Sequence, residues 1–280
     1  MVQAPPATDI YVADLHVAGR RVSVGPPVNV TARPGYDNQP FFLPDGRAFL
    51  YTAVHDGQAD IYRYDLGRHT SVQVTATRES EYSPTPLPDG KGFSVVRVEA
   101  DSTQRLWAFD ADGSHPHLVL DSIKPVGYHA WADDHTVVLF VLGAPPTLQT
   151  ADSRAPMAGP GFVIRRDIGR SLQRIPGRHA AVSFVQHDSV AGNWLEELDL
   201  QPAQITKLVK APPGADFFVW TRDGIVLTAS GTTLYQWDSR RGGEWEVVAD
   251  FAPAGLTNVT RLAVSPRGDR LAIVAVPAIP

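Results

Sequence analysis

The sequence contains no cysteine, only two methionines and no long apolar run among its 280 residues. Without cysteine, the chain can form no disulfide framework, thiolate zinc site, iron–sulfur cluster or cysteine nucleophile. No segment approaches the roughly 18 consecutive apolar residues of a membrane-spanning helix, so we expect no membrane span. The chain is mildly acidic, with 25 Lys and Arg against 30 Asp and Glu and a formal net charge of −5. This balance argues against nucleic acid as a partner.

The N-terminal residues 1–7 are mostly polar or small, include two prolines, and lack the basic start and apolar centre of a signal peptide. They are similar to the start of a mature exported chain to which a methionine has been added. We therefore expect a periplasmic or otherwise exported protein, with a cytoplasmic one as the alternative. The absence of cysteine fits both locations.

The remaining composition is that of a folded all-β protein. Hydrophobic residues make up 43% of the chain and charged residues 20%, which is enough for a sizeable core. Glycine and proline are spread along the chain, and no segment shows helical periodicity. Five Asp-Gly pairs favour tight hairpin turns between segments rich in β-branched and aromatic residues. These pairs are Asp45-Gly46, Asp56-Gly57, Asp89-Gly90, Asp112-Gly113 and Asp223-Gly224.

A turn motif recurs six times at nearly constant spacing. Its clearest copies are Phe42-Leu43-Pro44-Asp45-Gly46-Arg47 and Pro86-Leu87-Pro88-Asp89-Gly90-Lys91. More divergent copies lie around positions 134, 177, 223 and 267, so successive copies are 44, 45, 43, 46 and 44 residues apart. Each copy precedes an apolar segment. A repeat of this length, built from short strands, is typical of β-propellers.

A second motif, an apolar strand that ends in Asp, keeps the same spacing. Its first copy, Ile10-Tyr11-Val12-Ala13-Asp14, lies near the N-terminus, whereas the last turn motif is followed by only one strand. A two-stranded ribbon would leave unpaired edges, so we expect the N-terminal strands to complete the last sheet. The sequence thus predicts an all-β, six-bladed β-propeller with four-stranded antiparallel blades. We expect a single domain over residues 1–280, with the sixth blade shared between about residues 8–32 and 256–277.

The best copy of the complete repeat is Pro40-Phe41-Phe42-Leu43-Pro44-Asp45-Gly46-Arg47 followed by Asp60-Ile61-Tyr62-Arg63-Tyr64-Asp65. This pattern resembles the repeat of TolB-like (WD40-like repeat) β-propellers. The resemblance covers essentially the whole chain, without the extra N-terminal domain of TolB itself. It implies that the motif residues are structural, with Asp-Gly at a blade turn and Pro and aromatic residues packed between sheets. The resemblance implies no active site.

Familiar catalytic motifs are absent from the sequence, including Gly-x-Ser-x-Gly, His-Glu-x-x-His and Gly-x-x-x-x-Gly-Lys. His115-Pro116-His117 is the one close histidine pair, and a specific metal site needs three or four converging ligands. Asp133-Asp134-His135 occupies the turn position of the third repeat, where Asp is expected for backbone reasons. We therefore predict no catalytic residue, no bound metal and no cofactor.

The mouth of the propeller channel is the predicted binding site, because the innermost strand of every blade starts there and the surface is concave. The predicted ligand-binding residues are Tyr36, Asp37, Glu81, Tyr82, Tyr128, His129, Arg170, Arg174, Asp216 and Arg261. Tyr and Arg at a rim favour a protein, peptide or glycan ligand, because both side chains combine apolar area with hydrogen bonding.

Other roles stay open for these residues. Each acid could cap a turn or pair with Arg, and the tyrosines could pack between blades. His129 stands where sister repeats have Pro40 and Pro84, so a group that titrates near neutral pH replaces a rigid spacer. We favour a monomeric, non-catalytic binding or scaffold protein. The alternative is a metal-dependent lyase or lactonase-type hydrolase in the same channel, whose metal would be held by His129 with Asp37, Glu81 or Asp216.

Overall fold

The computed structural model describes residues 6–155, 159 and 161–277, and its one helix within them is a short 3-10 turn, Ala252–Ala254. The strands form six small antiparallel sheets. The fold class is a six-bladed β-propeller, as the repeat predicts. By contacts, the chain divides into two compact units: unit 1, residues 1–84 and 217–280, and unit 2, residues 85–216. The prediction of a single domain over residues 1–280 stays a prediction.

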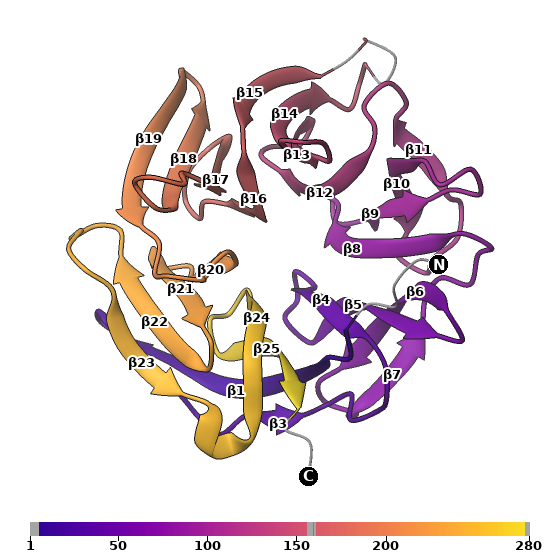
Figure 1. The fold of residues 1–280 in the computed structure, drawn as a ribbon. Coiled ribbons are helices and arrows are strands. Elements are labelled where there is room, and N and C mark those ends of the chain that lie inside the picture. Colours follow the sequence, from indigo (N-terminus) through magenta and orange to yellow (C-terminus); the bar gives the residue numbers. More distant parts are fainter. Residues whose placement is uncertain (1–5, 156–158, 160, 278–280) are drawn as a thin grey trace. The chain divides into compact units, whose positions relative to one another are not determined.

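Unit 1 holds the first, fifth and sixth blades (Figure 1). The first blade consists of β4 (Asp37–Phe42), β5 (Ala48–His55), β6 (Gln58–Asp65) and β7 (Thr70–Gln73). The fifth consists of β20 (Phe218–Trp220), β21 (Ile225–Ser230), β22 (Thr233–Asp238) and β23 (Glu246–Asp250). The sixth consists of β24 (Leu256–Val264), β25 (Arg270–Pro277), β1 (Asp9–Ala18) and β2 (Arg21–Val24), with β3 (Val28–Asn29) added to β1.

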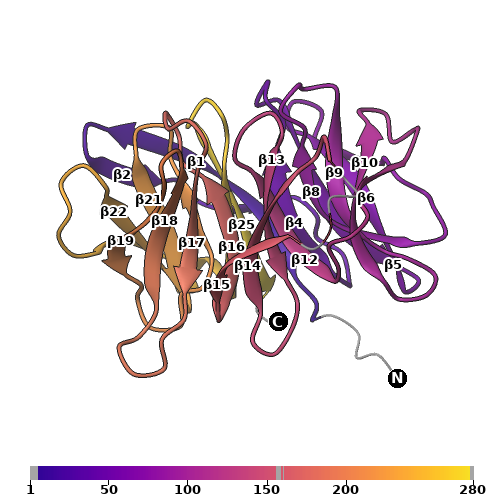
Figure 2. The same ribbon diagram turned by 90° about the horizontal axis from the view of Figure 1, so that it is seen from above.

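Unit 2 holds the third and fourth blades and most of the second, because the boundary between the units falls within β8. The second blade consists of β8 (Ser80–Pro86), β9 (Gly92–Val98), β10 (Gln104–Asp110) and β11 (His117–Leu120). The third consists of β12 (Val126–Trp131), β13 (Thr136–Val141), β14 (Thr147–Asp152) and β15 (Phe162–Arg166). The fourth consists of β16 (Ile168–Arg174), β17 (Ala181–Gln186), β18 (Trp194–Leu200) and β19 (Ala203–Lys210), which lie side by side in Figure 2.

Each of the six turn motifs connects the first two strands of a blade. Asp45 Oδ1 accepts a hydrogen bond of 2.9 Å from the backbone N–H two residues later, and Gly46 has a φ of 65°. Asp89 Oδ1 repeats this bond at 3.0 Å. In the third blade Asp133 has this role. Its Oδ1 accepts hydrogen bonds of 2.8 and 2.7 Å from the backbone N–H groups of His135 and Thr136. The aspartate side chains of these turns therefore accept hydrogen bonds from the backbone. The positive φ of Gly46 is a conformation that favours glycine at this position.

The N-terminal strand completes the last blade, as predicted. Strand β1 pairs antiparallel with β25 from Asp9 opposite Ala275 to Asp14 opposite Arg270. The other half of β1 pairs with β2, while β3 pairs with its residues 11 and 12. Figure 1 shows β1, from one end of the chain, beside β25, from the other.

Within each unit, apolar side chains fill the space between neighbouring blades. Within unit 1, Ile10, Phe49 and Val274 are fully buried in one cluster shared by the first and sixth blades. Phe49 also stacks on Tyr64, with ring centroids 5.2 Å apart. In unit 2, Phe184 lies in a cluster shared by the third and fourth blades. Consecutive buried residues along β5, β9, β13, β17, β21 and β25 place buried side chains on both faces of each blade.

Replacing Ile10 by alanine should destabilise the protein strongly, because Ile10 is 0% exposed at the junction between β1 and β25. A buried Ile to Ala change costs about 2–5 kcal/mol of unfolding free energy. For a chain of this size, that corresponds to a fall in melting temperature on the order of 5–15 °C. Thermal unfolding followed by circular dichroism measures the change.

His16→Ala is the matched control, because His16 lies on the same strand but is exposed, and it should leave the melting temperature nearly unchanged. Deletion of residues 1–16 removes every pairing between β1 and β25 and should cause a larger loss or aggregation. A deletion variant as stable as the full chain would show that β1 is not needed to complete the blade.

Candidate functional site

Most candidate residues lie at or near the start of the first strand of a blade, where several of these strands depart from a regular ladder. The pairing of β4 with β5 shifts register between Asn38 and Phe41, and that of β24 with β25 shifts between Thr257 and Arg261. In unit 2, β12 and β16 shift in the same way near their starts. Gln39, inside the first of these irregular segments, has a φ of 59°. Such bulges take residues out of the ladder and re-aim their side chains.

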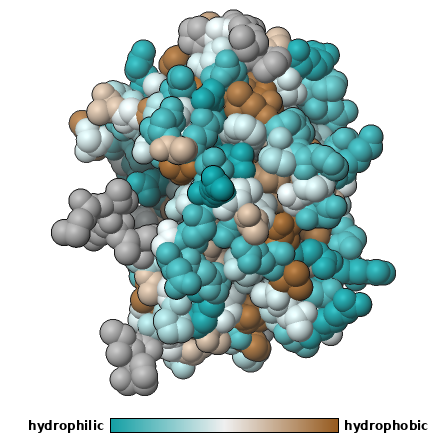
Figure 3. Space-filling view, turned by 90° about the vertical axis from the view of Figure 1, so that its right-hand side faces the viewer, coloured by the Kyte–Doolittle hydropathy of each residue, from teal (hydrophilic) through white to brown (hydrophobic). Residues whose placement is uncertain are grey.

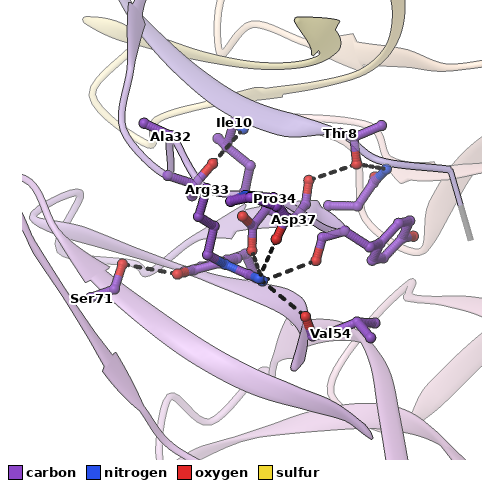
Figure 4. A network of polar contacts seen from close by, with 12 residues as sticks. Thr8, Ile10, Ala32, Arg33, Pro34, Asp37, Val54 and Ser71 are labelled. Carbon is purple, nitrogen blue, oxygen red and sulfur yellow. Dashed lines mark hydrogen bonds and ion pairs between the residues drawn. The ribbon is translucent and has the colours of Figure 1, made fainter. Parts of the chain in front are cut away.

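Asp37 lies in the centre of a polar network in unit 1 (Figure 4). Its carboxylate is 0% exposed, and Oδ1 accepts a charge-assisted hydrogen bond of 2.5 Å from Arg33 Nη2. The same guanidinium donates to the carbonyl oxygens of Pro34, Tyr36 and Val54. Arg33 therefore fixes the loop before β4 as well as the carboxylate. Tyr36, a predicted ligand-binding residue, contributes its backbone to this network and is half-buried.

Burial dominates the protonation of Asp37. It raises the pKa of the carboxyl group to about 6, even though the charge and hydrogen bond of Arg33 act in the opposite direction. The second carboxylate oxygen, Oδ2, is buried and accepts no hydrogen bond within the described part of the chain. Asp37 is therefore a buried carboxyl group that is bonded to Arg33 and binds its proton more tightly than an exposed one.

Glu81 occupies the same repeat position in the second blade, since Asp37 and Glu81 each precede the turn aspartate by eight residues. It is also 0% exposed. Its Oε1 accepts a hydrogen bond of 2.5 Å from Thr77, and its Oε2 accepts one of 3.1 Å from Thr75. The neighbouring Tyr82 is half-buried, and burial raises the pKa of its phenol. Both predicted acids of unit 1 therefore have internal partners.

Arg261 is the partly exposed cation among the candidates of unit 1. It lies at the end of the irregular segment of β24, and its guanidinium carbon is 4.0 Å from the ring centroid of Phe217. Stacking on an aromatic face uses the flat face of a guanidinium, whose N–H groups lie in its plane. The pair thus combines an apolar surface with a positive charge.

His129 in unit 2 is buried, with an exposed fraction of 6%. Its Nε2 lies 2.7 Å from the hydroxyl of Ser94, which also accepts a hydrogen bond of 2.9 Å from the indole of Trp131. Burial lowers the pKa of His129 to about 3, so the ring is neutral at physiological pH. Nδ1 is buried and has no hydrogen-bond partner among the described residues.

Asp216 is held by a histidine that the sequence did not single out. His187 Nε2 lies 2.9 Å from Asp216 Oδ1, and His187 Nδ1 lies 3.9 Å from Asp167 Oδ1. Gly169 lies against this carboxylate, since a Cβ at that position would collide with it. The side chains of His187 and Asp216 are partly exposed, and that of Asp167 is exposed. The sequence gives no signal for this pair, because 29 residues separate the two partners.

The remaining candidates of unit 2 differ in position. Arg170 is exposed and lies within the irregular segment of β16, between Ile168 and Leu172. Arg174 is also exposed, but it is the last residue of β16, at the turn end of the strand. Tyr128 is half-buried, with its ring edge on Phe140 at a centroid distance of 5.7 Å. Arg170 is therefore the exposed cation of unit 2 that lies in a bulge.

Two features that the described residues lack are relevant to function. In residues 6–155, 159 and 161–277, no three His, Asp or Glu side chains converge closely enough to hold a metal ion. No helix in this part of the chain is long and apolar enough to cross a membrane. The face drawn in Figure 3 is mainly hydrophilic, with apolar side chains in small separate groups.

The fold and repeat define the architecture of a TolB-like β-propeller. No protein-family model matches the sequence. Among solved structures, putative TolB from Agrobacterium tumefaciens superposes with a TM-score of 0.73 at 14% identity, covering 98% of this chain and 100% of that one. A gluconolactonase from Xanthomonas campestris superposes with a TM-score of 0.64 at 12% identity, over 98% of this chain and 99% of that one. For oligogalacturonate lyase in complex with manganese the TM-score is 0.57 at 15% identity, over 96% and 78%.

These similarities show the fold. TolB proteins and enzymes share it, so the architecture alone assigns no activity.

Asp37 should make the protein less stable as pH rises through about 6. Its carboxyl binds a proton more tightly in the folded state, where the pKa is about 6, than in the unfolded state, where it is near 3.8. The stability from this proton is therefore complete below pH 4 and lost as pH rises through 6. The free energy of unfolding of the wild type minus that of Asp37→Asn, from urea titrations, should fall by about 3 kcal/mol over this range.

Arg33→Gln is the informative companion variant, because the positive charge of Arg33 lowers the pKa of Asp37. In its background the same difference should fall at higher pH. A difference that rises with pH, or is flat between pH 4 and 7, would contradict the raised pKa of the buried carboxyl.

Proposed function

We propose that this protein is a non-catalytic binding module that holds a protein, peptide or glycan through side chains at the bulged ends of its first strands. The observation that carries the proposal is a contrast between two groups of candidates. Asp37, Glu81 and His129 are buried and bonded to neighbours, whereas Arg170 is exposed and Arg261 partly so.

The buried groups are poorly suited to acid–base catalysis. A general acid or base must come within hydrogen-bond distance of the proton that it transfers. Asp37 and Glu81 are both 0% exposed, and their oxygens face Arg33 and threonine hydroxyls of their own loops. His129 is neutral and hydrogen-bonded to Ser94. These contacts stabilise the starts of the first strands, which is a structural task.

The arginines supply recognition chemistry in each unit. In unit 1, Arg261 stacked on Phe217 offers a flat surface that combines a positive charge with an aromatic ring. In unit 2, Arg170 lies in the bulge of β16, and this residue is exposed. Guanidinium groups pair with carboxylates in a planar, two-bond geometry. We therefore expect a ligand that presents carboxylate groups.

The competing function is a metal-dependent lyase or lactonase-type hydrolase. It draws on the fold shared with oligogalacturonate lyase in complex with manganese and with a gluconolactonase. In this chain its metal would need His129, whose Nε2 lies beside the Ser94 hydroxyl and whose Nδ1 is buried without a partner. The burial of His129 and its hydrogen bond to Ser94 argue against a metal-dependent enzyme.

A monomer in the periplasm, or otherwise exported, completes the proposal, and a cytoplasmic location is the alternative. The N-terminal residues 1–5, on which part of the expectation rests, lie outside the described residues.

Arg170→Ala and Arg261→Ala should each reduce retention of the ligand, by about fivefold or more if the guanidinium makes a paired contact. The assay is pull-down from an envelope extract with immobilised protein, quantified against wild type. Arg222→Ala is the matched control, because Arg222 is an exposed arginine in the turn after β20, at the other end of a first strand. Equal capture by all four proteins would contradict a role for the bulged ends.

Metal analysis of the purified protein separates the two functions. We expect no stoichiometric Mn²⁺, Ca²⁺ or Zn²⁺ in the wild type, because His129 is bonded to Ser94. Ser94→Ala frees the imidazole without removing it and serves as the companion to His129→Ala. Stoichiometric metal that is kept in Ser94→Ala and lost in His129→Ala would overturn the binding proposal in favour of the enzyme.

A further inference from the structure

Unit 1 contains a cavity of about 730 Å³ that none of the candidate residues lines. It lies between β1 and β6 and reaches the turns that precede β5 and β25. Its wall includes Val12, Asp14, Arg47, Arg63, Arg267 and Arg270. We call it the closure cavity, because β1 is the strand that completes the sixth blade. Pockets for small molecules occupy about 300–1,000 Å³, so its volume suits such a ligand.

The cavity exists because β1 has a divided outer partner. Strand β2 pairs with residues 15–18 of β1, and β3 pairs with Tyr11 and Val12. Between β2 and β3, Gly25 bonds to the carbonyl of Asp14, and two prolines follow it. Proline has no N–H to continue a ladder, so the chain leaves the edge of β1 here. Val12 and Asp14, two residues apart, lie on one face of the strand and line the opening.

The carboxylates around the cavity are satisfied locally. Asp45 Oδ1 accepts a bond of 2.9 Å from the amide of Arg47, which closes its turn. Asp65 Oδ1 likewise accepts two backbone N–H bonds of 3.0 Å within its own turn. Asp14 Oδ1 pairs with Arg270 Nη1 at 2.7 Å. The negative charges of the wall are therefore engaged close to where they originate.

Three arginines of the wall keep hydrogen-bonding capacity. Arg267 Nη2 donates to the carbonyl of Asp45 at 2.9 Å, which uses one of its five N–H groups. Arg63 Nη1 is 3.8 Å from an oxygen of Asp65, beyond hydrogen-bond distance. The Arg47 side chain makes no hydrogen bond or ion pair with any residue that the structure describes. The remaining donors favour an anionic group as their acceptor.

Another part of the wall is apolar. Val12, Val30 and Leu66 are half-buried side chains that pack against the cluster shared by the first and sixth blades. The ring of Tyr64 also borders the cavity and is itself mostly buried. An inorganic ion would leave this surface facing water, whereas a ligand with a carbon body would cover it. The wall therefore suits an anion attached to an organic body.

We propose that the closure cavity binds a small organic anion, a carboxylate or a phosphate on a compact sugar or carbon body. Arg47, Arg63 and Arg267 hold the anionic group, and the side chains of Val12, Val30 and Leu66 contact the body. Arginine can bind a carboxylate or a phosphate through two parallel N–H bonds, so the same donors suit both anions. This site is separate from the bulged ends and does not depend on the function proposed for them.

Titration calorimetry with three probes tests the proposal: glucuronate, glucose 6-phosphate and uncharged glucose. Binding of one or both anions at millimolar concentration or below, without comparable binding of glucose, supports it, and the anion that binds identifies the source. Arg47→Gln and Arg267→Gln should each weaken that binding by about fivefold or more. Arg222→Gln should bind as wild type, because Arg222 lies in the corresponding turn of the preceding repeat, next to the position equivalent to Arg267, but does not line the cavity.

Melting temperatures check that each variant is folded, and Arg170→Ala should bind the probes as wild type. Failure of both anions to bind at about 10 mM would overturn the proposal, since that concentration detects even weak sites. Equal binding of glucose, or anion binding that survives in both Arg47→Gln and Arg267→Gln, would overturn it as well.

Discussion

The pairing of β1 with β25 is the interaction on which the sixth blade depends. Strands β24 and β25 alone would form a two-stranded ribbon with an unpaired edge and a half-covered apolar face, which is marginal in water. Six consecutive residue pairs, from Asp9 with Ala275 to Asp14 with Arg270, supply the missing partner. They also bring Ile10 against Val274 in a cluster that continues into the first blade. The pairing of β1 with β25 and the packing of Ile10 on Val274 therefore join the same two strands, which lie near opposite ends of the sequence.

The same pairing has a second consequence on the outer side of β1. A strand that joins from the far end of the chain has to be followed by a connection to the first blade. Here the connection is made by β2, a Gly-Pro-Pro segment and β3. The segment cannot keep a continuous ladder with β1, and the gap exposes Val12 and Asp14 to the closure cavity. The way in which the sixth blade is completed thus creates a concave surface beside the arginines of neighbouring turns.

The repeat itself could be predicted from the sequence, because its signals are local. Asp-Gly pairs report a backbone conformation, and a fixed spacing of apolar strands reports a unit that must stack on its neighbours. The fold class, the turns and the shared sixth blade follow from these signals. The roles of the candidate side chains do not. Position eight before the turn residue is buried in every repeat, and it holds Asp37 and Glu81 in two of them but Val126, Gly169, Ala215 and Val259 in the others.

The sequence did not reveal that the two acids occupy a core position, and their predicted role in ligand binding stays a prediction. A carboxylate is expensive to bury, and each one has a partner four residues earlier, Arg33 for Asp37 and Thr77 for Glu81. That spacing was visible in the sequence, but only the loop geometry shows that the two side chains meet. The link between His187 and Asp216 had no local signal at all, because its partners come from different elements.

Function in this architecture is decided by few side chains, because the blades use most of the others. The irregular starts of β4, β12, β16 and β24 free a small number of residues from the ladder in each unit. Asp37 and His129 flank these segments, and burial and internal bonds hold both side chains. Arg170 lies within the irregular segment of β16 and is exposed, and Arg261 ends the irregular segment of β24 and is partly exposed. A guanidinium is costly to desolvate and is not neutralised by loss of a proton, which favours its place at the surface. Under the function proposed above, the guanidinium groups at these ends would pair with carboxylate-bearing ligands.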